Sequence, residues 1–133
     1  MRLVTVEDVQ YFEKLCDQIK NLDSKIRFVG VISEMGKIIA GGPKEGTKLL
    51  VDEREHEMLF LEVALRIRMR HEFNRQLGPV NFTISHRDKV VVMSMPFDDK
   101  IMYVSADKEL NLSKVPFSIL EIMRRKDNET KHR

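Results

Sequence analysis

A predicted helix over residues 52–77 most constrains how this chain can fold, because that helix is apolar on two opposite sides. With about 100° of rotation per residue, one stripe along the helix is formed by Met58, Leu61, Leu65 and Met69. A second stripe, roughly opposite, is formed by Leu59, Phe60, Val63 and Ile67. A helix in a small globular protein normally buries one face, so the second face requires its own cover. Either the helix runs through the middle of the molecule or it meets a partner, and the periodicity leaves open which stripe faces the rest of the chain.

Composition indicates one globular domain. The chain has 133 residues, of which 42% are hydrophobic and 33% charged, and its net charge of +2 argues neither for nor against a nucleic-acid partner. Cys16 is the single cysteine, which excludes an internal disulfide and a cysteine-based zinc site. The N-terminus turns acidic at once and no stretch approaches the ~18 apolar residues of a membrane span, so we expect a cytoplasmic protein without a membrane partner.

Capping residues and breakers divide the first half of the chain. Two capping boxes mark predicted helix starts, at Thr5 with Asp8 and at Asp52 with Glu55. The β-branched and aromatic segment IRFVGVIS, residues 26–33, predicts a central strand, and residues 37–40 predict a short second strand. The dipeptide Gly78-Pro79 predicts the end of the long helix.

The second half of the chain is rich in strands. Strands are predicted over residues 80–86, 90–95 and 101–106, and a last helix over residues 113–123. The first of these strands alternates apolar and polar residues, which indicates a sheet edge. Residues 1–125 are predicted to form a single domain, and residues 126–133 a disordered basic tail.

The predicted order is helix, two strands, long helix, three strands and helix. Hairpin-length turns make most neighbouring strands antiparallel. Strands that are apolar on both sides need helices on both faces of the sheet. We therefore predict an α/β (α+β) protein, built as a three-layer α/β/α sandwich.

The sequence contains no residue set that identifies a reaction. Residues 41–48 resemble a phosphate loop in glycine spacing, but the lysine and threonine are transposed and Pro43 removes an amide, so a strand-to-helix connection is the better interpretation. His56 and His71 are about 22 Å apart along one helix and cannot share a metal ion. We predict no enzymatic activity, no metal and no cofactor.

Charges are graded along the long helix. Its first half carries Glu53, Glu55, Glu57 and Glu62, and its second half carries Arg66, Arg68, Arg70 and Arg75. The arginines are scattered around the helix among apolar residues, which argues against a nucleic-acid partner. A helix of this kind complements a second copy of itself when the two run antiparallel, as a twofold dimer requires. The charge gradient and the second apolar stripe together predict a homodimer.

The element order, the long central helix and the segment VNFTISHRDKVVVMSMPFDDKIMYVSADKEL resemble the Roadblock/dynein light chain family or a profilin-like relative. The resemblance covers roughly residues 6–123. The short and highly charged sequence is also similar to uncharacterised archaeal members of this broad group. It implies a five-stranded antiparallel sheet in the order 2-1-5-4-3, with the first and last helices on one face and the long helix on the other.

The resemblance also implies a function. Members of this family commonly dimerise through the long helix and the third strand, and act as adaptors or regulators of small GTPases. The corresponding interface residues in this chain are Leu59, Phe60, Val63, Ile67, Arg70, Asn74, Asn81, Thr83 and Ser85. We therefore expect a non-enzymatic homodimeric adaptor whose partner is a small GTPase or another protein.

The alternative is a profilin-like or PAS-like domain that senses a small ligand. In that case the second apolar stripe and Met93, Met95 and Met102 would line a cavity, although methionines more often fill the core.

Overall fold

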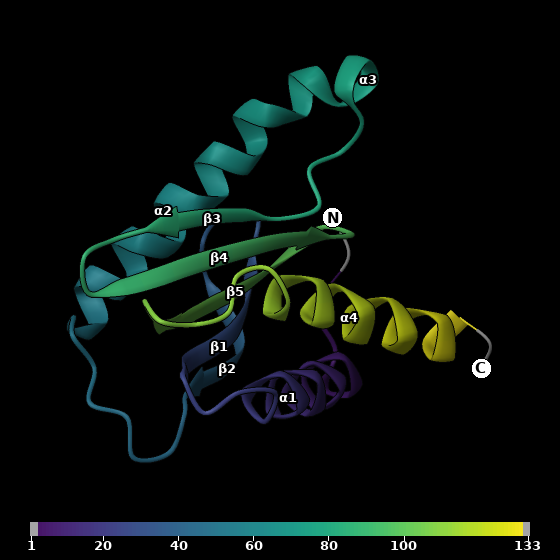
Figure 1. Cartoon of the computed structure of the whole chain (residues 1–133). Coiled ribbons are helices and arrows are strands. Elements are labelled where there is room, and N and C mark those ends of the chain that lie inside the picture. The colour runs from purple at the N-terminus through teal and green to yellow at the C-terminus, as the bar shows by residue number, and fades with distance from the viewer. Residues whose placement is uncertain (1–2, 132–133) are drawn as a thin grey trace.

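Helices cover both faces of a five-stranded sheet in the computed structural model, which describes residues 3–131 (Figure 1). The helical elements are α1 (Val6–Lys20), α2 (Glu53–Arg70), the 3₁₀ helix η1 (His71–Phe73), α3 (Asn74–Leu77) and α4 (Val115–Lys131). The strands are β1 (Ile26–Ser33), β2 (Ile38–Pro43), β3 (Thr83–His86), β4 (Val90–Phe97) and β5 (Lys100–Asp107). The predicted α/β/α sandwich and its order of elements are confirmed.

The strands lie in the order β2-β1-β5-β4-β3, and every neighbouring pair is antiparallel. This confirms the order 2-1-5-4-3 that the family resemblance implies. β1 has neighbours on both sides and helices on both faces, which explains why its sequence is apolar at almost every position. β3 is an edge strand, as the alternation in its sequence predicts.

The core of the first layer lies between the sheet and the helices α1 and α4. Leu15 of α1 and Ile119 of α4 are buried there against side chains of β1, β4 and β5. Met93, Met95 and Met102 belong to the same core and have no exposed surface. These methionines therefore fill the space between sheet and helices, as methionines more often do, and do not line the ligand cavity of the alternative hypothesis.

The second layer is the single helix α2. Phe60 and Ala64 pack on the opposite face of the sheet against Phe28 and Tyr103, with 4.9 Å between the ring centroids of Phe60 and Tyr103. The turn between β1 and β2 also reaches the helix. A Cβ atom added to Gly36 in this turn would lie 2.8 Å from backbone atoms of Leu61, so the turn is in direct contact with the backbone of α2.

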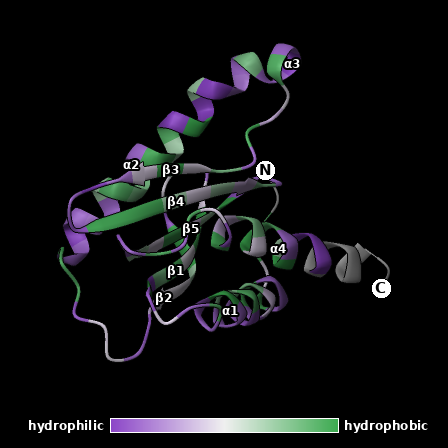
Figure 2. Cartoon of the chain, viewed as in Figure 1, coloured by the Kyte–Doolittle hydropathy of each residue, from purple (hydrophilic) through white to green (hydrophobic). Residues whose placement is uncertain are grey.

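The second part of α2, with η1 and α3, extends past the β3 edge of the sheet (Figure 1). Hydrophobic residues are distributed along its whole length, including the part that lies beyond the sheet (Figure 2). The predicted single helix over residues 52–77 is thus a helical segment with a 3₁₀ turn near its end, and Gly78 caps it with a positive φ of 82°.

Apart from the division of the long helix, three boundaries differ from the sequence prediction by three residues or more. β2 continues through Gly41 and Gly42 to Pro43, because these residues still pair with β1 along an edge strand. β3 starts three residues later than predicted, at Thr83. α4 continues to Lys131, since no glycine or proline follows to stop it, so the predicted tail of residues 126–133 starts within this helix. Residues 132–133 lie outside the described part.

Candidate interaction surface

β3 presents an open strand edge. Its four residues pair with β4 alone, from Thr83 opposite Ser94 to His86 opposite Val91. The outer side of an edge strand carries backbone N–H and C=O groups that can bind a further strand. Thr83 and Ser85 are half-buried and lie on the sheet face beneath α2. β3 can therefore extend the sheet into a second molecule.

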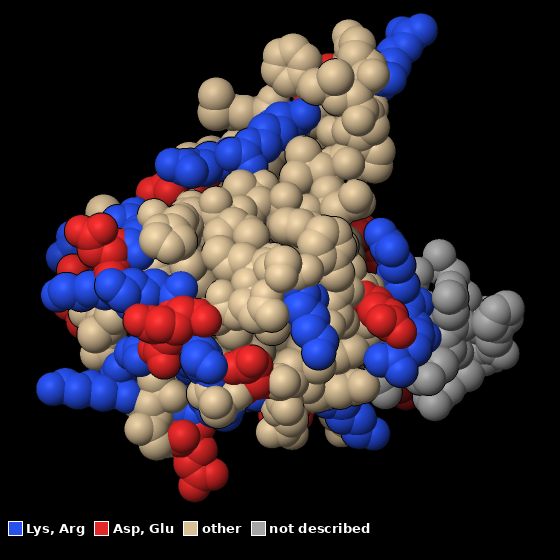
Figure 3. Space-filling model, in the orientation of Figure 1, with Lys and Arg blue, Asp and Glu red and all other residues tan. Residues whose placement is uncertain are grey.

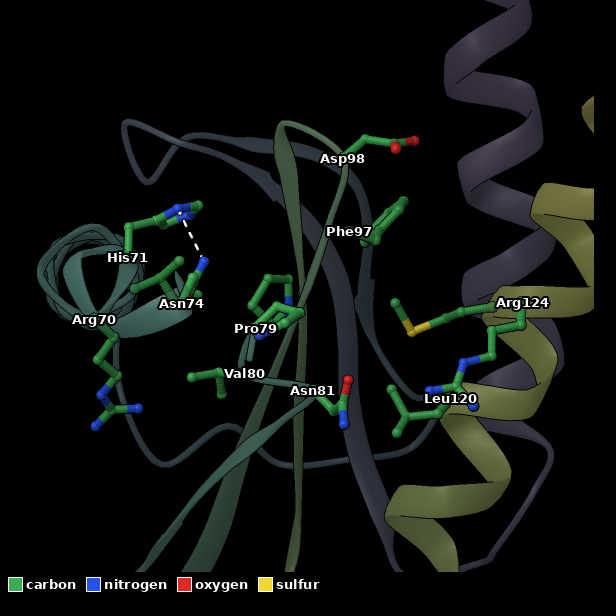
Figure 4. A pocket seen from close by; sticks show the side chains of 13 residues that line it. Arg70, His71, Asn74, Pro79, Val80, Asn81, Phe97, Asp98, Leu120 and Arg124 are labelled. Atoms are coloured by element: carbon green, nitrogen blue, oxygen red, sulfur yellow. Dashed lines mark hydrogen bonds between the residues drawn. The ribbon is translucent and has the colours of Figure 1, made fainter. Parts of the chain in front are cut away.

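The end of α2 overhangs a hollow of about 360 Å³ beside this edge (Figure 4). Ile67 and His71 of the overhanging segment form one wall, and Leu120 of α4 belongs to the opposite wall. Pro79 and Asn81, which lead into β3, lie between the two walls. The residues predicted for the dimer interface at this position, Ile67, Arg70, Asn74 and Asn81, all line the hollow. The structure thus brings this part of the predicted set together.

Two other residues of the predicted set face the sheet of their own chain. Phe60 is 4% exposed, and Val63 packs partly against the same cluster, as Ile67 does on its way to the hollow. The placement of Phe60 in the dimer interface is therefore wrong, because Phe28 and Tyr103 already enclose its ring.

The uncovered stripe of α2 is the opposite one. Met58 is 67% exposed and Met69 73% exposed, and Leu61 and Leu65 between them are also exposed. At four-residue steps the stripe continues beyond α2 to Phe73 and Leu77, which is 81% exposed. The sequence prediction did not include Phe73 and Leu77 in the stripe. Their four-residue spacing from Met69 is the pattern from which they could have been predicted. We call these six residues the outer stripe.

Polar contacts fix α2 relative to the sheet. Arg70 Nη1 donates to Thr83 Oγ1 of β3 at 2.5 Å, and Arg68 Nη2 donates to the Glu34 carbonyl of the β1–β2 turn at 3.1 Å. Arg66 forms an ion pair with Glu62 one turn earlier, at 3.2 Å. Three of the four predicted helix arginines thus have partners within the chain. Arginine side chains run along α2 above a largely uncharged surface over β3 and β4 (Figure 3).

The segments that the sequence suggested for chemistry have structural roles. The Gly41 amide donates to Glu13 Oε1 at 2.9 Å, which places a carboxylate where a phosphate loop would need to bind an anion. Burial raises the pKa of the Cys16 thiol to about 12, so the thiol stays protonated and unreactive. Among residues 3–125, whose side chains the structure describes, no three metal-ligating side chains of His, Cys, Asp or Glu come together. Over the same residues, no helix has the length and apolar character needed to span a bilayer.

Comparison with solved structures confirms the fold. The gliding protein MglB from Thermus thermophilus is 12% identical and has a TM-score of 0.72, with 96% of this chain and 95% of MglB covered. The Roadblock/LC7 domain from Streptomyces avermitilis is 8% identical, with a TM-score of 0.67 and coverage of 90% and 97%. Profilin from Schizosaccharomyces pombe is 11% identical, with a TM-score of 0.57 and coverage of 84% and 92%. At these identities the matches establish a Roadblock-like, profilin-like fold.

Sequence comparisons give a narrower result. No curated protein matches the chain. The model of one protein family matches residues 5–131, which is nearly the full length. The chain therefore belongs to that family, which is described as a family of unknown function (DUF6659).

Proposed function

We propose that the chain is a non-enzymatic adaptor that forms a homodimer and binds a further protein through the outer stripe. The observation that carries the proposal is the overhang of α2, which leaves apolar surface without a cover on the sheet side of the helix and on its outer side. A helix that extends beyond its own sheet is stabilised when a second sheet continues beneath it.

A twofold axis beside β3 would supply this second sheet. Two β3 edges would then pair antiparallel, and the overhanging end of each α2 would lie over the sheet of the other protomer. Ile67 and Asn74 are half-buried and line the hollow, so their side chains are positioned to contact a sheet placed there. A structure of MglB with a tetrameric arrangement shows that a protein of this fold can assemble through its surfaces.

The charge gradient of α2 favours the same arrangement. Two α2 helices that run antiparallel place the acidic first turn of each, with Glu53 and Glu55, near the basic last turn of the other, with Arg68 and Arg70. Such contacts between exposed side chains add little stability but select the antiparallel orientation.

The outer stripe would remain accessible in this dimer and is the proposed site for the partner protein. Its six residues are exposed and follow one another at three- or four-residue steps along α2, η1 and α3. An exposed patch of this kind commonly marks a protein interface. The Roadblock resemblance makes a small GTPase the first partner to test, in the cytoplasm as the sequence predicts.

The dimer is tested with two matched substitutions on opposite sides of α2. Ile67→Glu places a charge beside the hollow, and Leu65→Glu places the same charge on the outer stripe. Light scattering and sedimentation over a range of concentrations should show a dimer for the wild type and Leu65→Glu, and a monomer for Ile67→Glu. Asn74→Glu should also be monomeric, and it avoids the core entirely. A wild-type monomer at high concentration would contradict the dimer.

The partner is tested separately. Small GTPases of the native host, loaded with GDP or with a non-hydrolysable GTP analogue, are titrated against the wild type and Leu65→Glu. We expect binding that Leu65→Glu abolishes while the dimer persists. Equal binding by both proteins would show that the outer stripe is not the partner site.

A further inference from the structure

A second cavity, of about 600 Å³, lies on the α2 face of the sheet, away from the hollow under the overhang. One wall is the connection between β2 and α2 at Leu49 and Leu50, and the opposite wall is the β3–β4 turn at residues 87–89. The floor is the sheet at Val92 and Ser105. Its volume is within the range of small-ligand sites, which is about 300–1,000 Å³. The cavity shares no lining residue with the hollow under the overhang.

Arg27 holds the first wall in place. Its Nη2 atom donates to the Lys48 carbonyl at 2.6 Å, and its Nη1 atom lies 3.4 Å from Asp107 Oδ1 at the end of β5. The Lys44 amide adds a bond to the Arg27 carbonyl at 2.8 Å. These contacts anchor a connection that otherwise lacks secondary structure, so Leu49 and Leu50 remain at the cavity although both are exposed.

The inner part of the cavity is apolar and uncharged. Leu59 and Val92 contribute aliphatic surface, and the His56 ring stacks on Phe60 with 5.0 Å between centroids. Burial lowers the pKa of His56, and burial raises the pKa of Tyr103 to about 12. Both side chains are therefore neutral at pH 7. Together with the Ser105 hydroxyl, they provide a few hydrogen-bonding groups on an apolar surface, as ligand sites typically do.

The rim of the cavity carries more positive than negative charge. Arg87 and Lys89 on the β3–β4 turn are exposed cations, with the single carboxylate of Asp88 between them. Arg27 on the other side has its charge opposed by Asp107. The geometry points to a binding site for a small organic acid, with an apolar body in the cavity and a carboxylate at the Arg87–Lys89 rim. The class of ligand follows from charge complementarity at the rim and the apolar surface below it.

Two probes of this chemistry and one uncharged analogue test the proposal. 2-Naphthoate and decanoate are titrated into the full chain and followed by calorimetry and by amide chemical shifts, and 2-naphthamide is the uncharged control. We expect at least one acid to bind, with shifts centred on residues 49–51, 87–92 and 103–105. The double variant Arg87→Gln/Lys89→Gln should weaken binding of that acid by about fivefold or more and leave any binding of the amide unchanged. The charge-matched control Lys14→Gln/Lys37→Gln, at exposed positions outside the cavity, should bind the acid like the wild type.

A second variant fills the cavity. Ser105→Phe places a large side chain on its floor, at a half-buried position of β5, and should abolish binding of the acid while far-ultraviolet circular dichroism stays unchanged. The proposal is overturned if neither acid binds at millimolar concentration, or if the amide binds as tightly as the acid. It is also overturned if Ser105→Phe converts a dimer into a monomer, because the cavity would then be covered by a second copy. Each result is independent of whether Ile67→Glu changes the oligomeric state.

Discussion

Replacing Gly36 with alanine tests how closely the β1–β2 turn approaches α2. Gly36 has a positive φ of 78°, and a Cβ atom at this position would lie 2.8 Å from the backbone nitrogen and Cα of Leu61. A contact this short cannot be relieved by a side-chain rotation, because both atoms belong to the helix backbone. Either the turn or the helix has to move.

The expected loss of stability has two parts. A residue other than glycine in the left-handed region costs about 1–2 kcal/mol. Displacing the turn from α2 disturbs the packing of Phe60 against Phe28 and adds about 1–3 kcal/mol, as overpacked cores do. The sum is about 2–5 kcal/mol for Gly36→Ala. Gly46→Ala is the matched control, because Gly46 has a similar φ of 82° but no atom within 4 Å of an added Cβ, so it should lose about 1–2 kcal/mol.

Urea denaturation followed by circular dichroism measures both losses, provided that the slope of the transition is the same for wild type and variants. The difference between the two variants isolates the contact between the turn and α2. If Gly36→Ala and Gly46→Ala lost equal amounts, the turn would not be held against the helix and the reasoning would be refuted.

Two further predictions concern α2 itself. Phe60→Ala should lower the free energy of unfolding by about 3–5 kcal/mol, whereas Leu61→Ala on the exposed side should change it by about 0.5 kcal/mol or less, and similar losses in urea denaturation would contradict the orientation of the helix. Because burial lowers the pKa of His56 below its ordinary value of 6.5, the unfolded chain binds more protons than the folded chain as the pH falls below 6.5. Stability should therefore decrease over that range, and His56→Phe should remove this part of the decrease; an unchanged pH profile would count against a buried, neutral His56.

Local signals predicted the elements that depend on local interactions. Both capping boxes form as their sequences predict, since Thr5 and Asp52 bind the amides of residues three positions later. β1 has the predicted bounds because its run of β-branched and aromatic residues matches a strand that is buried on both faces. Gly78 ends the helical segment through a positive φ, as glycine at this position does.

Contacts between distant segments determine which stripe of α2 is buried and how far β2 extends, and neither could be predicted from the sequence. The two stripes of α2 are similarly apolar, so periodicity gave no reason to choose Phe60 over Leu61 as the buried residue. The choice depends on the β1–β2 turn, where only glycine allows the backbone of Leu61 to approach, and on the aromatic rings of Phe28 and Tyr103. The extension of β2 has a similar origin. A Cβ atom at Gly41 would lie 2.2 Å from the Val29 carbonyl oxygen, so glycine here permits close strand pairing instead of stopping the strand.

The energetics of α2 give the strongest physical reason to expect a partner. Of its 18 residues, all within the described part, Phe60 and Ala64 are buried, and both lie in the first two thirds of the helix. An isolated helix of this length is marginal in water, so most of its stability has to come from packing of its apolar face. Beyond Ile67, Arg68 donates to the Glu34 carbonyl and to Met35 Sδ in the β1–β2 turn, and Arg70 donates to Thr83. Polar contacts of this kind contribute about 1 kcal/mol each. The apolar side chains of Met69, Phe73 and Leu77 remain in water. Their exposure disfavours a helix end that has no partner. A cover for the end of α2 would therefore stabilise this helix more than it would any other element of the fold.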